Sequence, residues 1–270
     1  MKKSIGLVCA SAILLAACSP PKQTQQGISL ANGGKVWASL WQQRAAEYKA
    51  LCFQAYNLAK LRLDEALAKS SGNNKPMAVV TDIDETLLDN SPYDAMRALN
   101  NQEYTLDTWK TWTAKADADT VPGAPAFFKY AASKGVQVYY ITNRDESERE
   151  GTTKNLQKYG LPYTDAAHIF LKNGPSSKEA RRQQVAAKCD IVLLCGDNLP
   201  DFDKVYDDKR PEAERTAATE RLRKEFGSRY IVIPNPSYGD FESALFKYNY
   251  KLSGAQKDSV IKANIKLEKQ

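Results

Sequence analysis

Two short acidic motifs carry the residues best suited to chemistry. Residues 82–86 read Asp-Ile-Asp-Glu-Thr, and residues 196–202 read Gly-Asp-Asn-Leu-Pro-Asp-Phe. Each motif follows an apolar run, at 78–80 and at 191–195, that is typical of a buried strand. Parallel strands end along one crevice, so we expect the two motifs to meet there. The acids brought together are Asp82, Asp84, Asp197 and Asp201.

Four carboxylates within a few ångströms raise one another's pKa and cannot all ionise without a cation. A hard divalent metal would supply that charge. Mg2+ fits best, because it takes oxygen ligands and is commonly held by one or two carboxylates together with substrate phosphate oxygens. The sequence therefore predicts a magnesium site built from these four aspartates.

A carboxylate can also act as a nucleophile on phosphorus. Asp82, the first acid after its strand, could attack in line and form an aspartyl-phosphate. Asp84 lies two residues on and points to the same side of an extended segment, so it could protonate the leaving oxygen and later deprotonate water. The usual motifs of phosphate-loop nucleotide hydrolysis, serine hydrolysis and zinc chemistry are missing. The single histidine, His168, lies in a predicted strand and is interpreted as structural.

The remaining pattern predicts an α/β fold. Apolar, β-branched runs alternate with helix-like stretches, which indicates right-handed crossovers and a mainly parallel sheet covered by helices on both faces. The predicted strands are 78–80, 136–141, 168–171, 191–195 and 230–233. The predicted helices between them lie near 123–134, 146–159, 176–188 and 211–226.

Three segments lie outside this alternation. Apolar residues at three- and four-residue steps predict one long helix over 35–61. Residues 91–121, rich in aromatic and polar side chains, are interpreted as a cap inserted over the crevice, and 239–270 as terminal helical structure. One folded domain is expected over residues 35–270.

The N-terminus has the features of a bacterial export signal. Lys2 and Lys3 precede a short apolar stretch, and small residues precede Cys18, so residues 1–17 are predicted to be cleaved. The pattern resembles a lipobox, which implies a lipidated Cys18, and Ser19 favours the outer membrane. Residues 18–34 are predicted to form a flexible tether.

The charge argues against nucleic-acid binding, and the cysteines indicate core packing. The net charge of +6 falls to +4 once the two lysines of the signal are removed, and no concentrated basic stripe indicates nucleic-acid binding. Apart from the lipid anchor Cys18, the mature domain keeps an odd set of cysteines, Cys52, Cys189 and Cys195, which we interpret as core packing.

The paired motifs resemble those of the haloacid-dehalogenase-like (HAD) phosphatases. Residues 80–93 and 196–202 follow the signature of the bacterial class C acid phosphatases, including the lipoprotein e type 5′-nucleotidases. The resemblance implies a HAD-like Rossmannoid sheet with a helical cap. It also implies that Asp82 is the nucleophile and Asp84 the acid and base. The implied Mg2+ ligands are the Asp82 carboxylate, the Asp84 backbone carbonyl and Asp197, with Asp201 in support.

The same resemblance suggests residues that bind substrate. Thr142 and the backbone amide of Asn143 would hold a phosphoryl oxygen, and Lys178 would offset its charge. Trp109 and Tyr238 would sandwich a nucleotide base. Arg144 could contact phosphate, or pair with Asp145 or Glu148 at the surface.

Together these features predict a Mg2+-dependent acid phosphatase that hydrolyses nucleoside 5′-monophosphates, with nicotinamide mononucleotide and aryl phosphates as further candidates. A homodimer is known in the family. Two alternatives stay open: a phosphotransferase that uses the same acids, and a non-catalytic surface lipoprotein that binds haem or another ligand.

Overall fold

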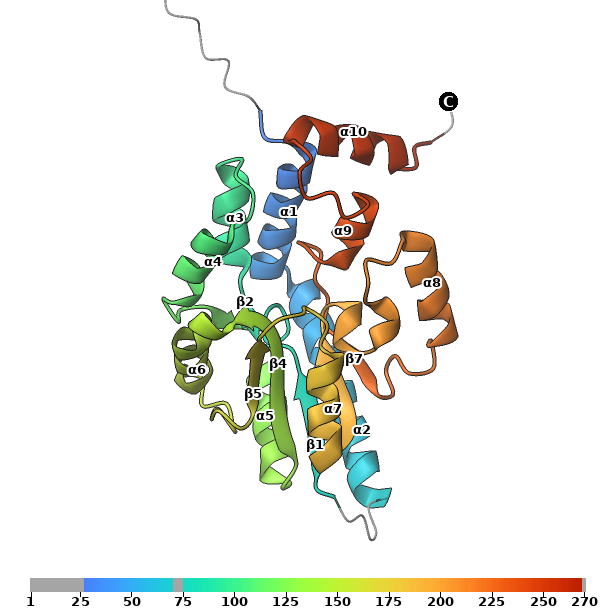
Figure 1. Ribbon diagram of the computed structural model, residues 1–270. Coiled ribbons are helices and arrows are strands. Elements are labelled where there is room, and N and C mark those ends of the chain that lie inside the picture. The colour runs from blue at the N-terminus through green and yellow to red at the C-terminus, as the bar shows by residue number, and fades with distance from the viewer. Residues whose placement is uncertain (1–26, 70–74, 269–270) are drawn as a thin grey trace, which may run out of the picture.

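A computed structural model describes residues 27–69 and 75–268, which form an α/β fold around a five-stranded parallel sheet (Figure 1). The strand order is β5-β4-β1-β6-β7, and every neighbouring pair is parallel. The strands are β1 (Met77–Thr81), β4 (Gln137–Asp145), β5 (Ile169–Lys172), β6 (Asp190–Gly196) and β7 (Tyr230–Val232). All five predicted strands are present, so the predicted sheet is confirmed.

The two faces of the sheet are covered by different helices because alternate strand residues point to opposite sides. Val79 of β1 packs into one hydrophobic cluster with side chains of α2 (Ala46–Lys69) and α5 (Ala124–Ser133). Its neighbours Ala78 and Val80 belong to a second cluster, which includes Val185 of α7 (Glu179–Lys188). The central strand is therefore buried on both sides, as its continuous apolar run indicates.

The single helix expected over residues 35–61 is wrong. Two helices occupy this part of the chain, α1 (Leu30–Arg44) and α2, and they are separated at Ala45, whose backbone is extended with φ −77° and ψ 128°. The break lets α1 pack on α3 (Ser91–Leu99), while α2 packs on α5 and β6. Hydrophobic spacing alone could not locate it, because apolar residues recur on both sides of the break.

The folded part also begins before Lys35. The Ser29 hydroxyl accepts a hydrogen bond from the Asn32 N–H at 3.2 Å and caps the first turn of α1. Residues 30–34 of the expected tether are therefore helical. The rest of that tether up to residue 26, the expected signal at 1–17 and Cys18 all lie outside the described residues.

The insertion at 91–121 forms α3 and α4 (Leu106–Thr113), and a short antiparallel pair, β2 (Leu88–Asp89) with β3 (Asp119–Thr120), joins its two ends. The terminal segment supplies α9 (Asp240–Leu245) and α10 (Gly254–Asn264). Figure 1 shows that α1, α3, α4, α9 and α10 gather at one end of the sheet. We call these five helices the cap.

The helix predicted near 146–159 is present as the 3-10 turn η1 (Glu146–Glu148) followed by α6 (Arg149–Lys158), and the one near 211–226 is present as α8 (Glu212–Arg221), which ends earlier than predicted. The 3-10 turns η2 (Leu199–Asp201) and η3 (Lys204–Tyr206) were not predicted. Helix α7 begins at Glu179 rather than near residue 176. Within residues 27–69 and 75–268, none of the helices is both long enough and apolar enough to cross a bilayer.

The cysteines and the histidine are structural. Cys52, Cys189 and Cys195 are buried free thiols, as predicted. His168 lies in the turn just before β5 rather than in the strand, and its Nδ1 contacts the Asp165 carboxylate at 2.8 Å.

Candidate active site

Three of the four predicted acids meet at the carboxyl end of the sheet. Asp82 follows β1, Asp197 follows the neighbouring strand β6, and Asp201 lies in η2. Each offers a carboxylate oxygen within 4.8 Å of the others. Gly196 permits this approach, because a Cβ there would lie 2.5 Å from the side chain of Asp201. These oxygens form a donor set that could hold a metal ion.

Lys178, at the start of α7, lies among these acids. Its Nζ is 2.5 Å from Asp82 Oδ1 and 2.7 Å from Asp201 Oδ1, and the residue is only 5% exposed. Although burial opposes its charge, the carboxylates of Asp201 and Asp82 raise the pKa of Lys178 above its ordinary value. A buried ammonium at this position is suited to neutralise an anionic group bound beside Asp82.

Burial also raises the pKa values of two of these acids. It raises the pKa of Asp82 to about 7, with Lys178 opposing the rise and Asp201 adding to it. Burial raises the pKa of Asp197 well above its ordinary value, and the charges of Asp201 and Asp82 raise it further. Both carboxylates are therefore held in a site that favours an additional positive charge.

Asp84 does not join this cluster, so the expectation that four carboxylates meet at one point is wrong. The Asp84 carboxylate accepts a hydrogen bond from Arg144 Nη2 at 2.7 Å and another from Arg144 Nε at 3.1 Å. Asn90 Nδ2 donates a third at 2.9 Å. The Asp84 carboxylate is thus held by Arg144 and Asn90 and is not part of the three-carboxylate group, and the metal-ligand role expected for its backbone carbonyl stays a prediction.

Arg144 has a partner that the sequence did not predict. It is 2% exposed and pairs with Asp84 rather than with Asp145 or Glu148 at the surface. The feature that could have indicated its place at the site is its position near the end of β4, which is adjacent to β1 in the sheet. The pair of Arg144 with Asp84 is separate from the three clustered carboxylates, whose charges and that of the directly paired Lys178 leave two negative charges, which one divalent ion would balance.

Thr142 and Asn143 end up in different surroundings. Thr142 is fully buried, and its Oγ1 accepts the Arg144 backbone N–H at 3.1 Å. Asn143 is exposed and lines the pocket above the acids, and its Oδ1 accepts from Arg181 at 2.7 Å. The predicted phosphate contacts of Thr142 and Asn143 stay predictions.

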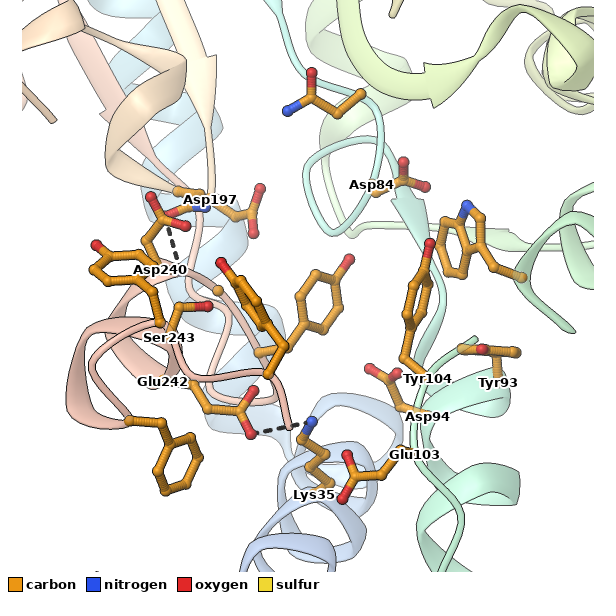
Figure 2. Close-up of a pocket in the computed structure, with 18 of the residues that line it drawn as sticks. Lys35, Asp84, Tyr93, Asp94, Glu103, Tyr104, Asp197, Asp240, Glu242 and Ser243 are labelled. Carbon is orange, nitrogen blue, oxygen red and sulfur yellow. Dashed lines mark hydrogen bonds and ion pairs between the residues drawn. The ribbon is translucent and has the colours of Figure 1, made fainter. Parts of the chain in front are cut away.

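A pocket of about 680 Å³ leads from the acids into the cap. Figure 2 shows residues from α9, including Asp240, Glu242 and Ser243, facing Asp94 and Tyr104 across it. Lys35 of α1 lies at its far end and pairs with Glu242 at 3.2 Å. The pocket is therefore walled by segments from the two ends of the chain and by the insertion.

Aromatic side chains line much of this pocket. Both predicted stacking residues, Trp109 and Tyr238, are among them. Trp109 is only 9% exposed, because it packs edge-on to Tyr93 at 5.3 Å and beneath the Arg144 guanidinium at 5.8 Å. Tyr104 is 57% exposed and Tyr250 is 71% exposed, so sequence reasoning missed two more accessible rings.

Glu85 links the loop after β1, which carries Asp82 and Asp84, to the pocket wall. It is fully buried with φ +56°, accepts the Asn90 N–H at 2.8 Å and accepts a hydrogen bond from the Tyr238 hydroxyl. Burial, followed by the charges of Asp94 and Asp84, raises the pKa of Glu85 well above its ordinary value.

The comparisons with known proteins agree with this geometry. Residues 22–241 match the family described as HAD superfamily, subfamily IIIB (acid phosphatase). The chain belongs to this acid phosphatase family. Its fold is therefore HAD-like, and the resemblance of the paired acidic motifs to this superfamily is confirmed.

Two solved structures and one further protein are similar to this chain. The class C acid phosphatase from Bacillus anthracis superposes with a TM-score of 0.83 at 43% identity, covering 88% of this chain and 99% of that one. The same enzyme with tungstate bound gives 0.82 at 42% identity, covering 89% and 99%. The stem 31 kDa glycoprotein of Glycine max is 25% identical over 162 residues, which are 58% of this chain and 57% of that protein.

Proposed function

We propose that this acid phosphatase is Mg2+-dependent and hydrolyses nucleoside 5′-monophosphates through an aspartyl-phosphate on Asp82. The observation that carries the proposal is the position of Asp82. It directly follows β1, contacts Lys178 and lies within reach of Asp197 and Asp201 at the base of an aromatic-lined pocket.

In the first half-reaction, an oxygen of Asp82 attacks phosphorus, and the bond from phosphorus to the leaving oxygen breaks. Asp84 gives its proton to that oxygen, so the leaving group departs as an alcohol. Lys178 offsets charge on the phosphoryl oxygens. The hydrogen bonds from Arg144 and Asn90 fix the direction in which Asp84 delivers the proton.

In the second half-reaction, Asp84 takes a proton from water as the water oxygen attacks the phosphorus of the aspartyl-phosphate. The bond from Asp82 to phosphorus breaks, which releases phosphate and restores the Asp82 carboxylate. Asp84 is then protonated again, so the cycle closes without another proton source.

Asp82, Asp197 and Asp201 fit Mg2+ because all three offer hard carboxylate oxygens and, together with the paired Lys178, leave an excess of two negative charges. When bound, the ion would neutralise phosphoryl oxygens. Asp197 is kept in place by hydrogen bonds from Thr86 Oγ1 at 3.3 Å and Asn235 Nδ2 at 2.8 Å. Such supporting contacts are typical of carboxylates that hold a metal.

The pocket supports a nucleoside leaving group. Its volume of about 680 Å³ lies within the range of small-molecule sites, and exposed tyrosine rings accept the flat face of any base. The related Bacillus anthracis enzyme was solved with tungstate, a tetrahedral oxyanion like phosphate. That likeness supports a phosphoryl group beside Asp82.

Release of phosphate from nucleoside 5′-monophosphates, measured with and without Mg2+, tests the proposal. Activity should require Mg2+, disappear with a chelator and be lost in Asp82→Asn. Glycerol phosphate serves as the comparison substrate, because it offers no ring to stack. Equal catalytic efficiency on both substrates would refute the preference for nucleotides, and full activity of Asp82→Asn would refute the mechanism.

We also infer that the enzyme is anchored to the outer membrane through a lipid on Cys18. The support is the sequence pattern around this cysteine. Incorporation of labelled palmitate into wild type but not into Cys18→Ala, followed by membrane fractionation, tests the anchor.

A further inference from the structure

The segment after β7 approaches the catalytic acids and carries Tyr238. Three of its side chains each contact a carboxyl group on another segment. Asn235 Nδ2 donates to Asp197 at 2.8 Å, Ser237 Oγ donates to Asp94 at 2.8 Å, and the Tyr238 hydroxyl donates to Glu85. We call residues 235–238 the platform loop.

Asn235 also makes hydrogen bonds within this loop. Its Oδ1 accepts the backbone N–H of Ser237 at 2.9 Å and that of Tyr238 at 3.4 Å. The opposite amide orientation would place the NH2 group against two donors and the oxygen against a carboxylate, so only the observed orientation satisfies all these partners. One side chain therefore bonds both a candidate metal ligand and the backbone that carries Tyr238.

We propose that Asn235 is a positioning residue that joins the metal site to recognition of the leaving group. Its amide nitrogen orients the Asp197 carboxylate toward the metal, and its amide oxygen fixes the backbone from which the Tyr238 ring enters the pocket. The inference rests on the proposed function, because it assigns this loop to the nucleoside end of the substrate.

The contacts set Asn235 apart from its neighbours in the loop. Ser237 and Tyr238 bond Asp94 and Glu85, which lie outside the three-carboxylate cluster. Asn235 bonds Asp197, a member of it. Loss of the Asn235 amide should therefore disturb metal binding and substrate choice together, whereas loss of the Tyr238 ring should disturb substrate choice alone.

The test combines two measurements on the full chain. The first is the dissociation constant of Mg2+ alone, measured by calorimetry on chelator-stripped protein. The second is the ratio of kcat/KM for a nucleoside 5′-monophosphate to kcat/KM for glycerol phosphate, at saturating Mg2+. For Asn235→Ala we expect Mg2+ to bind about 10-fold to 100-fold more weakly. We also expect the ratio to fall about tenfold, because the stacked ring is no longer held in place.

Three variants separate the effects. Tyr238→Ala should lower the ratio and leave Mg2+ affinity unchanged. Asn235→Asp keeps the oxygen that accepts both loop N–H groups but has no donor for Asp197, so it should keep the wild-type ratio while its Mg2+ affinity changes from that of wild type. Asn264→Ala, which removes an exposed asparagine that bonds only within α10, should change neither quantity.

A change in only one of the two quantities in Asn235→Ala would overturn the proposal, as would a change in neither. If Asn235→Ala does not fold, Asn235→Asp tests the proposal. A lower ratio of the two kcat/KM values in that variant would show that the acceptor oxygen does not hold the loop and would overturn the proposal. Failure of the proposed function would look different, because wild type would then show no preference for nucleotides while Mg2+ binding still responded to Asn235.

Discussion

At the scale of single residues, the site depends on which charges are directly paired. Asp82 shares Lys178 with Asp201, whereas Asp84 is held by Arg144 and Asn90. Asp82 and Asp84 therefore lie two residues apart in the chain but in different electrostatic surroundings. Such a separation suits the proposed mechanism, in which one acid attacks phosphorus while the other transfers protons.

Arg144→Lys should test the role assigned to the pair with Asp84. Lysine keeps the positive charge but cannot donate two parallel bonds to one carboxylate, so Asp84 would lose its fixed direction. We expect kcat to fall by roughly 10-fold to 100-fold, which is no more than the lower end of what general acid–base catalysis contributes because Asp84 itself remains, with a smaller change in KM. Steady-state kinetics on a nucleotide measures both. Unchanged kcat would show that Arg144 does not direct Asp84.

The sequence revealed the residues that belong to a motif at the end of a predicted strand. Asp82, Asp197 and Asp201 were predicted because two apolar runs place them at neighbouring strand ends. Asn235 and the partner of Arg144 were missed because the contacts with Asp197 and Asp84 join residues far apart in the chain. The strand position of Arg144 brings it to the site, but neither residue belongs to a motif from which its partner can be inferred.

At the scale of secondary-structure elements, the cap is fastened to the sheet domain by α4. Thr113 Oγ1 donates to the buried Glu148 at 2.9 Å, and Lys110 pairs with Asp145 at 3.2 Å. Gly151 of α6 lies so close that a Cβ there would be 2.5 Å from the Thr113 carbonyl oxygen. Helix α4, which carries Trp109, is thus positioned by close contact with α6.

Gly151→Ala should push α4 away from α6. The new methyl group has no space, so we expect a loss of about 1–3 kcal/mol in the free energy of unfolding. We also expect a higher KM for nucleotides, because the Trp109 side of the pocket moves. Gly33→Ala is the matched control: it lies in α1 with nothing within 4 Å of the new Cβ. The control should be neutral or slightly stabilising, and equal losses in the two variants would argue against the close contact.

The elements themselves were predictable to different degrees. The five strands are present because β-branched apolar runs bury both faces of a parallel sheet. The division between α1 and α2 was not predictable, because the residues around Ala45 have good helical spacing. Packing of α1 on α3 and α10, which are distant in sequence, determines the break.

At the scale of the whole molecule, buried acids make stability depend on pH. Burial raises the pKa of Asp94 to about 6, against the opposing hydrogen bond from Ser237. The folded protein therefore binds this proton more tightly than the unfolded chain, and the free energy of unfolding falls as pH rises from about 4 to about 6. Elevated carboxyl pKa values at the site thus favour the folded protein under acidic conditions.

Asp94→Asn should remove this dependence while keeping an acceptor for Ser237. Between pH 4 and pH 6, wild type should lose up to about 3 kcal/mol relative to the variant, from the shift between the ordinary value and about 6. Urea unfolding of metal-free protein at several pH values measures the difference. A constant difference between the two proteins across that range would contradict the expectation.

The central claim is that Asp82 becomes phosphorylated, and rapid quenching tests it most directly. Asp84→Asn lacks the base for the second step, so an aryl phosphate, whose leaving group departs without a proton, should accumulate the intermediate. Borohydride reduction after the quench converts an aspartyl-phosphate to homoserine, which peptide mass spectrometry locates. We predict homoserine at position 82, formed only when Mg2+ and substrate are both present. Homoserine at another position, or steady phosphate release with no modified residue, would contradict the mechanism.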